Sequence, residues 1–452
     1  MAFASRLLSL GLLLLATVSS RAWADLPISD RLDFGMYGRV GLAYSLDGRV
    51  IQGTRLNLRG GALGGRFEES DYLEPTLKFY ALKPDTEQSP GVRLVLTPAM
   101  FARTSFLGFF SSNTTPNLTI ELFQAYVEAT NVFLPGLSLW GGQRFYRGED
   151  VFMADYFYFN NLSAQGGGVR YKDLDFAVLV QTGSRTNAPA YQFDDNGDGT
   201  PEAQRQRMVF VSQYVRRFPQ GGEPDKERAH RLHLLAEVHA LPAARDRNGA
   251  EVLPSDSGWV LGAKGVLDFG NGNFNTLSVR YGRGIANGAI GGAQTWGTFG
   301  TADTFGRFSG AFALEVVDHF VFNVSRLLSI NGYGVLHLAR GGGGSEDRGF
   351  DTSVGARAFL YLHDRFHLVN ELTWQTRQDG HGPIGTATKL TVAPTIVPTG
   401  QRSVWERPHF RLFYTLAFYN QAARDALMAP YLQTFGPDAV GHYLGARVEW
   451  WF

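Results

Sequence analysis

The sequence predicts an all-β protein, a transmembrane antiparallel β-barrel in the outer membrane of a Gram-negative bacterium. Three observations lead to this prediction. Segments of about ten residues, in which apolar and polar side chains alternate, recur from one end of the chain to the other. The first residues resemble a secretory leader. The last ten residues, YLGARVEWWF, alternate in the same way and finish on aromatic side chains.

The N-terminal segment has the three parts of a signal peptide. Arg6 precedes an apolar stretch at residues 7–18, and Ala22-Trp23-Ala24 forms an A-x-A cleavage signature. About a dozen apolar residues are too few to span a bilayer. We therefore expect a signal peptide at residues 1–24 and a mature barrel domain at residues 25–452. We expect no transmembrane helix after residue 24.

Composition excludes several classes of protein. The chain has 42 basic and 42 acidic side chains, and removal of residues 1–24 would take away two arginines and no acid. Such a chain has no basic excess for binding nucleic acid. It has no cysteine, so disulfides and thiolate metal sites are excluded. Its 54 glycines and many aromatic residues suit a protein of strands, tight turns and aromatic belts.

Alternating segments have the length of membrane-spanning strands, about 9–11 residues when the strand is tilted. In each of them the apolar residues fall on one face and the polar residues on the other. Short turns such as residues 268–272 and long polar loops such as residues 187–202 separate the segments. Four clear examples are residues 33–44, 72–80, 274–283 and 408–419.

One pattern continues for most of the chain without a linker or a repeat block. A soluble β-sandwich would complete its core within roughly 100–200 residues and then begin a second domain. A closed barrel instead satisfies every backbone group in lipid without leaving an edge strand. At about 24 residues for each strand with its connection, residues 25–452 allow 16 to 18 strands.

The C-terminal segment is interpreted as the strand that closes the barrel against the first one. Trp451 falls on the polar face, so we expect its ring in the lumen. The opposite face is expected to contact lipid, with its terminal rings in the aromatic girdle. That face comprises Leu444, Ala446, Val448, Trp450 and Phe452.

Motifs of catalysis and metal binding are weak. The sequence contains no G-x-S-x-G and no H-E-x-x-H. His363 and His367 have the spacing of helical metal ligands, but a strand would place them far apart. Residues 194–199 copy the opening of a calcium loop, whereas its twelfth position is Arg205 instead of a glutamate. We expect a polar loop there, and a weak calcium site is the alternative. No enzyme, metal site or cofactor is predicted.

Aromatic residues on the polar faces of the strands are the main functional signal. Large apolar rings in contact with water are unfavourable unless a ligand uses them. A sugar ring could stack its C–H face on them, while its hydroxyl groups bond to charged neighbours such as Arg39, Glu74 and Arg280. The alternative is that the rings merely fill the lumen. The four rings are Tyr37, Tyr72, Phe274 and Trp451.

Several stretches of the chain resemble the maltoporin-type sugar porins, which are trimeric outer-membrane barrels of 18 strands. The similarity lies in LDFGMYGRVGLAY and GGRFEESDYLE near the start, and in SVWERPHFRLF and GARVEWWF near the end. The most specific stretch is LPGLSLWGGQRFYRGEDVFMADYFYFNN, at residues 134–161. It resembles the strand and the loop that fold into the pore as a constriction. The resemblance implies 18 strands, an inward-folded constriction loop and a homotrimer.

The resemblance also implies a path for maltodextrins or related oligosaccharides. Members of this family conduct these sugars along a row of aromatic rings, the greasy slide, beside a track of polar groups. Matching positions put Tyr37, Tyr72, Phe274 and Trp451 in the slide. Other matching positions put Arg39, Arg66, Glu74 and Asp155 in the polar track, and Arg147 and Phe157 in the constriction loop.

This sequence departs from the family pattern at several positions. The central tyrosine of the constriction loop is Phe157, and an arginine of that loop is Gly148 beside Arg147. An arginine of the polar track is replaced by Phe123, and a tryptophan of the slide by Leu362. The outer entrance of the slide has no matching tryptophan; its candidates are Phe106, Phe109 and Phe110.

The predicted function is that of a passive, sugar-specific outer-membrane porin that works by facilitated diffusion. The alternative is a general diffusion porin for small hydrophilic solutes and ions, which would lack a row of stacked rings. An outer-membrane hydrolase would need a nucleophile and a base at the mouth of the lumen, and we find neither in the sequence. Binding of phage or another ligand by the long loops is compatible with both transport functions.

Overall fold

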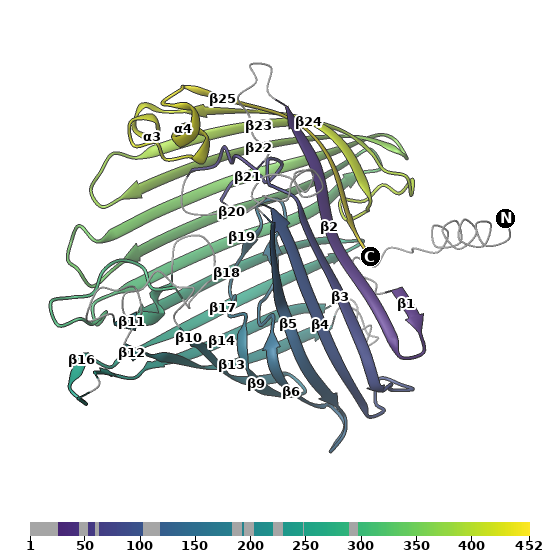
Figure 1. Cartoon of the computed structure of the whole chain (residues 1–452). Coiled ribbons are helices and arrows are strands. Elements are labelled where there is room, and N and C mark those ends of the chain that lie inside the picture. Colours follow the sequence, from purple (N-terminus) through teal and green to yellow (C-terminus); the bar gives the residue numbers. More distant parts are fainter. Residues whose placement is uncertain are drawn as a thin grey trace.

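The fold is described from a computed structural model of the whole chain (Figure 1). The residues that the structure describes are 26–44, 53–58, 63–102, 118–182, 192–193, 203–219, 229–246, 248–288 and 297–452. The predicted signal peptide, the calcium-like loop at 194–199 and the three entrance candidates Phe106, Phe109 and Phe110 lie outside them.

The described strands form a closed antiparallel barrel of 18 strands, which confirms the predicted fold class. Each strand pairs with the next one along the chain, so the topology is a simple meander (Figure 1). The barrel strands are β2 (Leu32–Tyr44), β3 (Tyr72–Leu82), β4 (Gly91–Ala102), β5 (Leu118–Thr130), β6 (Leu137–Arg144), β9 (Ala164–Tyr171), β10 (Leu174–Thr182), β13 (Gln206–Pro219), β14 (Ala229–Leu241), β17 (Asp256–Gly270), β18 (Asn273–Gly284), β19 (Phe312–Ser325), β20 (Leu328–Arg340), β21 (Arg348–His363), β22 (Phe366–Asp379), β23 (Gly385–Ile396), β24 (His409–Tyr419) and β25 (Val440–Trp451).

Strands β2 and β25 close the barrel, as the C-terminal alternation predicts. Tyr37 lies directly opposite Trp451 in the register. The amide of Met36 donates to the carbonyl of Phe452 at 2.8 Å, and the amide of Phe452 donates back at 3.0 Å. Trp450 points outward and covers Gly38, where a Cβ atom would come within 2.3 Å of its ring. A side chain at position 38 would therefore displace this ring.

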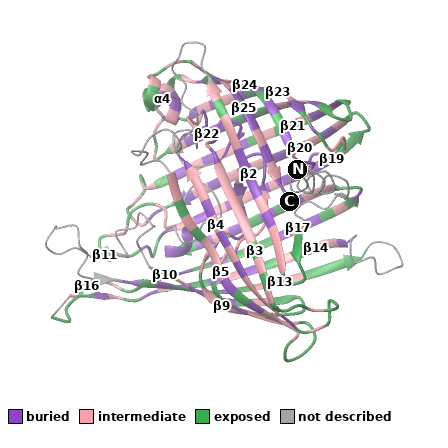
Figure 2. Cartoon of the chain, turned by 45° about the vertical axis from the view of Figure 1, so that its right-hand side comes forward, coloured by how far each residue is buried: buried purple, intermediate pink, exposed green. Residues whose placement is uncertain are grey.

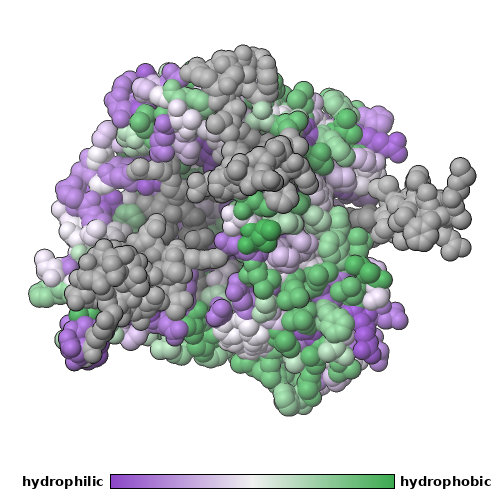
Figure 3. All heavy atoms as spheres, viewed as in Figure 1, coloured by the Kyte–Doolittle hydropathy of each residue, from purple (hydrophilic) through white to green (hydrophobic). Residues whose placement is uncertain are grey.

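Burial alternates along the strands with a period of two (Figure 2). In β24 the inward residues His409 and Thr415 are fully buried, whereas the outward residues Phe410 and Leu412 are 44% and 55% exposed. Apolar side chains gather on the outside of the barrel over the front strands β2 to β5, and polar ones gather towards the rim (Figure 3). This is the reverse of a soluble protein, and it matches a barrel surrounded by lipid.

Two connections fold into the barrel and fill much of its interior. In the connection between β2 and β3, the described residues 53–58 and 63–71 bury Leu56 and Phe67 against the inner wall. Residues 145–163, between β6 and β9, are the predicted constriction loop, and they include β7 (Asp150–Val151) and β8 (Tyr156–Phe157). The inner faces of the strands therefore contact packed loops over part of the barrel and the open lumen elsewhere.

The remaining elements are small. They are β1 (Leu26–Ser29), which pairs with β2, the pairs β11 (Gln192–Phe193) with β12 (Ala203–Gln204) and β15 (Ala244–Arg245) with β16 (Glu251–Leu253), η2 (Ile285–Asn287), α3 (Gln421–Asp425) and α4 (Pro430–Phe435). In the described part of the chain, no helix has the length and apolar character needed to cross a membrane.

Candidate functional site

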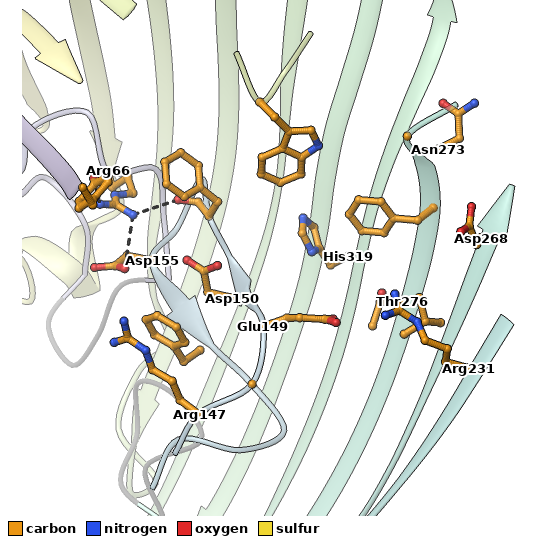
Figure 4. Close-up of a pocket in the computed structure, with 18 of the residues that line it drawn as sticks. Arg66, Arg147, Glu149, Asp150, Asp155, Arg231, Asp268, Asn273, Thr276 and His319 are labelled. Atoms are coloured by element: carbon orange, nitrogen blue, oxygen red, sulfur yellow. Dashed lines mark hydrogen bonds and ion pairs between the residues drawn. The ribbon is translucent and has the colours of Figure 1, made fainter. Parts of the chain in front are cut away.

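A cavity of about 820 Å³ lies inside the barrel, between the wall and the constriction loop (Figure 4). Strands β2 and β3 form one side of it, and the constriction loop forms a second side. The turn between β17 and β18, with adjoining residues of β14, β17, β18 and β19, lies opposite, and Arg66 and Trp405 also line the cavity. Residues that are far apart in the sequence therefore meet around one space inside the barrel.

Nine of the ten predicted site residues line this cavity. Trp451 is the exception. The nine are Tyr37, Arg39, Arg66, Tyr72, Glu74, Arg147, Asp155, Phe157 and Phe274.

Trp451 belongs to the inner face, as predicted, but it is covered. Its ring stacks on Tyr37 at a centroid distance of 6.4 Å, and the edge of Phe152 approaches at 5.1 Å. The guanidinium of Arg407 lies 3.8 Å from the ring centroid, and only 8% of Trp451 is exposed. Tyr37 is equally buried, at 7%, but Tyr37 lines the cavity and Trp451 does not, so Trp451 packs against Tyr37 without contributing to the cavity wall.

Tyr37 and Tyr72 form the aromatic part of the cavity wall. Their ring centroids are 5.8 Å apart, because β2 and β3 are neighbouring strands and both residues point inward. Arg39 lies 5.0 Å from the centroid of Tyr72, so it covers part of that ring with a cation–π contact. The hydroxyl group of Tyr72 donates a hydrogen bond to Glu74. Rings and charged groups thus alternate along this wall.

Glu69, in the segment that folds into the barrel, holds two arginines of the polar track. Its carboxylate lies 2.9 Å from Arg66 and 3.3 Å from Arg39. Burial alone would raise the pKa of Glu69, but the guanidinium groups of Arg39 and Arg66 lower it to about 2. The phenol oxygen of Tyr37 accepts hydrogen bonds from Arg66 at 2.8 Å and from Arg39 at 3.2 Å. The track is therefore held in place before any solute enters.

The constriction loop contributes charges of both signs. Asp155 forms an ion pair with Arg66, and Glu149 with Lys264 at 3.4 Å. Burial in the loop and the nearby charge of Asp155 raise the pKa of Asp150 to about 6. Arg147 lies between two rings, 3.8 Å from the centroid of Phe145 and 4.2 Å from that of Phe157.

Phe274 lies at the end of the cavity away from Tyr37 and Tyr72, near the turn between β17 and β18. Its ring meets His319 edge-on at 5.2 Å. Asp268, Asn273 and Arg231 surround this end with hydrogen-bonding groups (Figure 4). Of the predicted slide residues that line the cavity, Tyr37 and Tyr72 lie at one end and Phe274 at the other.

A family model described as LamB porin matches residues 32–452 of this chain. The chain belongs to the LamB porin family. As a porin of this family with an 18-stranded barrel, it is located in the outer membrane of a Gram-negative bacterium and forms a channel for solutes.

Two solved structures match nearly the whole length of this chain at low sequence identity. The channel DcaP of Acinetobacter baumannii is 10% identical, with a TM-score of 0.47 over 94% of this chain and 99% of that chain. OprD of Pseudomonas aeruginosa is 11% identical, with a TM-score of 0.41 over 95% of this chain and 98% of that chain.

Two aromatic residues of the cavity, Phe152 and Trp405, were not predicted from the sequence. Phe152 comes from the constriction loop and Trp405 from the connection between β23 and β24, and their rings are 6.4 Å apart. Both lie within stretches that resemble the sugar porins, RGEDVF and SVWERP. The resemblance was the one signal in the sequence that could have identified these two residues. A loop has no regular alternation of side chains, so its sequence does not show which side chains point into the cavity.

The structure shows where two of the residues that depart from the family pattern, Gly148 and Leu362, lie in this LamB-family porin. Gly148 lines the cavity, and a Cβ atom there would meet only backbone oxygens at 3.5 and 3.7 Å. A methyl group would therefore fit at this position. Leu362 is 62% exposed and follows the inward-facing, buried Tyr361. It therefore lies on the outer side of β21, outside the cavity.

The two histidines that have the spacing of helical metal ligands lie at a turn of this porin. Within the described residues, no group of three or more histidine, aspartate or glutamate side chains is placed to hold a metal ion. His363 and His367 fall on either side of the turn between β21 and β22. The imidazole Nδ1 of His363 accepts a hydrogen bond from the amide of Arg365, and His367 contacts the carbonyl of Asp364. Both histidines have structural roles in the turn.

Proposed function

We propose that this porin conducts maltodextrins or related oligosaccharides by facilitated diffusion, with Tyr37 and Tyr72 as the central rings of its slide. The observation that carries the proposal is the joining of these two rings to Arg39 and Glu74 in one cavity wall. A pyranose has an apolar face and a rim of hydroxyl groups, so it needs a ring and hydrogen-bonding groups side by side.

The charges of the track suit weak and reversible binding. Arg39 and Arg66 are each fixed by Glu69, so they need no rearrangement to receive a hydroxyl group. A channel must bind its solute well enough to recruit it and loosely enough to release it. Several modest contacts along a wall meet this condition, and no energy source is required.

The experiment is a measurement of ion current through the porin in a planar bilayer, titrated with maltodextrins of increasing length. Closure of the current at millimolar sugar would support the proposal. Tyr72→Ala should weaken the block by about 1–3 kcal/mol, a scale taken from the stacking of nucleic-acid bases on aromatic side chains. Leu73→Ala is the matched control, because Leu73 is the next residue on the outward face of β3.

A general diffusion porin is the second candidate. Trp451 and Leu362 occupy positions that the resemblance assigns to the slide, but neither lines the cavity. This function predicts a current that maltodextrins reduce only through viscosity, with no saturation. It also predicts no effect of Tyr72→Ala on that reduction.

We also propose that residues 1–24 are cleaved and that the porin is a homotrimer. The proposal about the leader rests on Ala22-Trp23-Ala24, and the trimer rests on the resemblance to the sugar porins. N-terminal sequencing of the purified protein should begin at Asp25. An unheated detergent gel should show a species near three times the mass of the heated one. An intact Met1, or a monomer alone by light scattering, would contradict the respective proposal.

A further inference from the structure

The row of aromatic rings continues beyond Tyr72, away from Tyr37. Phe101 stacks on Tyr72 at a centroid distance of 6.3 Å with an interplanar angle of 23°. Phe123 follows at 6.2 Å from Phe101, and Phe145 at 5.6 Å from Phe123. We name the three rings of Phe101, Phe123 and Phe145 the phenylalanine shelf. Each of them keeps part of its surface exposed.

The register of the barrel places the shelf on the inner face. Phe101 in β4 lies directly opposite Tyr72 in β3, so both rings point the same way. The pairing of β4 with β5 shifts by one residue, with Pro98 opposite Leu122 and Thr97 opposite Gln124. Phe123 is the extra residue of this bulge. Leu122 is 51% exposed on the outside, and Phe123 stays in contact with the inward ring of Phe101.

The shelf differs from the Tyr37–Tyr72 wall in its polar surroundings. The side chain of Gln124 accepts from the amide of Phe145 at 3.0 Å and donates to Thr97 at 2.9 Å. The amide nitrogen of Gln143 donates to backbone carbonyls at 2.8 and 3.2 Å. These groups are engaged within the protein, whereas the track beside Tyr72 holds charged side chains at the cavity surface.

Arg147 marks the end of the shelf. Its guanidinium lies between the rings of Phe145 and Phe157, and both Arg147 and Phe157 line the cavity. The shelf is therefore continuous at one end with Tyr72 and at the other with the constriction loop. The three phenylalanines do not line the 820 Å³ cavity itself; they extend the row of rings from Tyr72, at its wall, to Arg147.

We infer that the phenylalanine shelf is a subsite for an aromatic aglycone, so that the porin prefers aryl glycosides over unsubstituted sugars of the same length. This inference rests on the proposed function, because the sugar part of the ligand is assigned to the wall of Tyr37 and Tyr72. The side chains of Gln124 and Gln143 beside the shelf form hydrogen bonds within the protein, so they are less available to the hydroxyl groups of a sugar. An aryl ring needs apolar surface instead, and three successive rings supply it.

The test compares maltose with 4-nitrophenyl maltoside as blockers of ion current in a planar bilayer. Wild-type porin should bind the aryl glycoside about tenfold more tightly, on the scale of one stacking contact. Phe123→Ala should remove this preference and leave the block by maltose unchanged. Phe123→Leu keeps most of the apolar volume but has no aromatic ring, so it should also remove most of the preference for the aryl glycoside. This variant replaces Phe123→Ala if the alanine variant fails to assemble.

Leu122→Ala is the matched control, since it truncates the adjacent residue on the outer face of the same strand. It should preserve the preference. Equal block by the two ligands in wild type, or an equal loss for both ligands in the Phe123 variants, would overturn the inference while the sugar porin stands. If neither ligand blocks and Tyr72→Ala changes nothing, the proposed function fails and the aglycone subsite fails with it.

Discussion

The guanidinium of Arg66 lies 3.3 Å from the carboxylate of Asp155 (Figure 4). This ion pair joins the segment between β2 and β3 to the constriction loop, two connections that enter the barrel separately. Arg66 also donates to the backbone carbonyl of Phe152 at 3.3 Å. The position of the constriction loop is thus fixed by a side chain from another loop as well as by the barrel wall.

Asp155→Asn should change ion selectivity more than stability. Asp155 is about one-third exposed, so the pair contributes only about 0–1 kcal/mol to folding. Loss of the carboxylate leaves the charges of Arg66 and Arg39 less balanced, and the pore should become more selective for anions. The reversal potential in a salt gradient measures this shift. Glu87→Gln, in an exposed turn, should leave the potential unchanged, and a shift towards cations in Asp155→Asn would contradict the assignment.

Trp451→Ala should weaken the block by maltodextrins, although the ring is nearly buried. Its removal takes away the support behind Tyr37 and Phe152, and a change of this size in a packed site typically costs about 3–5 kcal/mol in stability. Trp450→Ala, on the lipid face, should leave the block unchanged. The titration of ion current with sugar for both variants checks this. A larger effect of Trp450→Ala than of Trp451→Ala would mean that the inner and outer faces of β25 are assigned the wrong way round.

Phe157→Tyr should make the constriction more selective. The ring lines the cavity and contacts Arg147, so an added hydroxyl group would face the solute. One hydrogen bond typically contributes about 1 kcal/mol, or about a fivefold stronger block by sugar. Single-channel conductance should fall slightly as well. Unchanged block together with unchanged conductance would place residue 157 away from the narrowest part of the pore.

Cation selectivity should fall between pH 7 and pH 5 because of Asp150. Burial and the charge of Asp155 raise the pKa of its carboxyl group to about 6, above the ordinary aspartate value of 3.8. The negative charge is therefore present at pH 7 and is lost as the pH falls through 6. A raised carboxyl pKa also means that this group favours folding more as the pH falls from about 6 towards 4. Reversal potentials measured across this range test the first effect.

Asp150→Asn is the control for the pH dependence. The variant carries no titrating group at this position, so its reversal potential should change much less between pH 7 and pH 5. Its value should resemble that of wild type at pH 5. If the variant shows the same transition as wild type, another carboxyl group is responsible.

The sequence alone determined the barrel and the inner face of those strands in which the alternation is clear. Alternation with period two is a local property, because successive residues of a strand must point to opposite sides. It was enough to place Tyr37, Tyr72 and Phe274 inward and Leu277 outward. The closure of β25 on β2 also followed from the alternation at the end of the chain.

Only the tertiary structure decided which inward residues reach the cavity. An inward side chain faces either the lumen or a loop folded inside the barrel, and that choice depends on contacts between distant parts of the chain. Trp451 is covered by Phe152 and Arg407, which come from two different connections. Phe123 joins the row of rings because a β-bulge shifts the register of β5 against β4 by one residue. The alternation of apolar and polar residues does not predict this bulge. The side of the strand to which a side chain points is set by its position in the local alternation. Whether an inward side chain reaches the pore depends on packing between loops that are far apart in the sequence, and no local pattern encodes that packing.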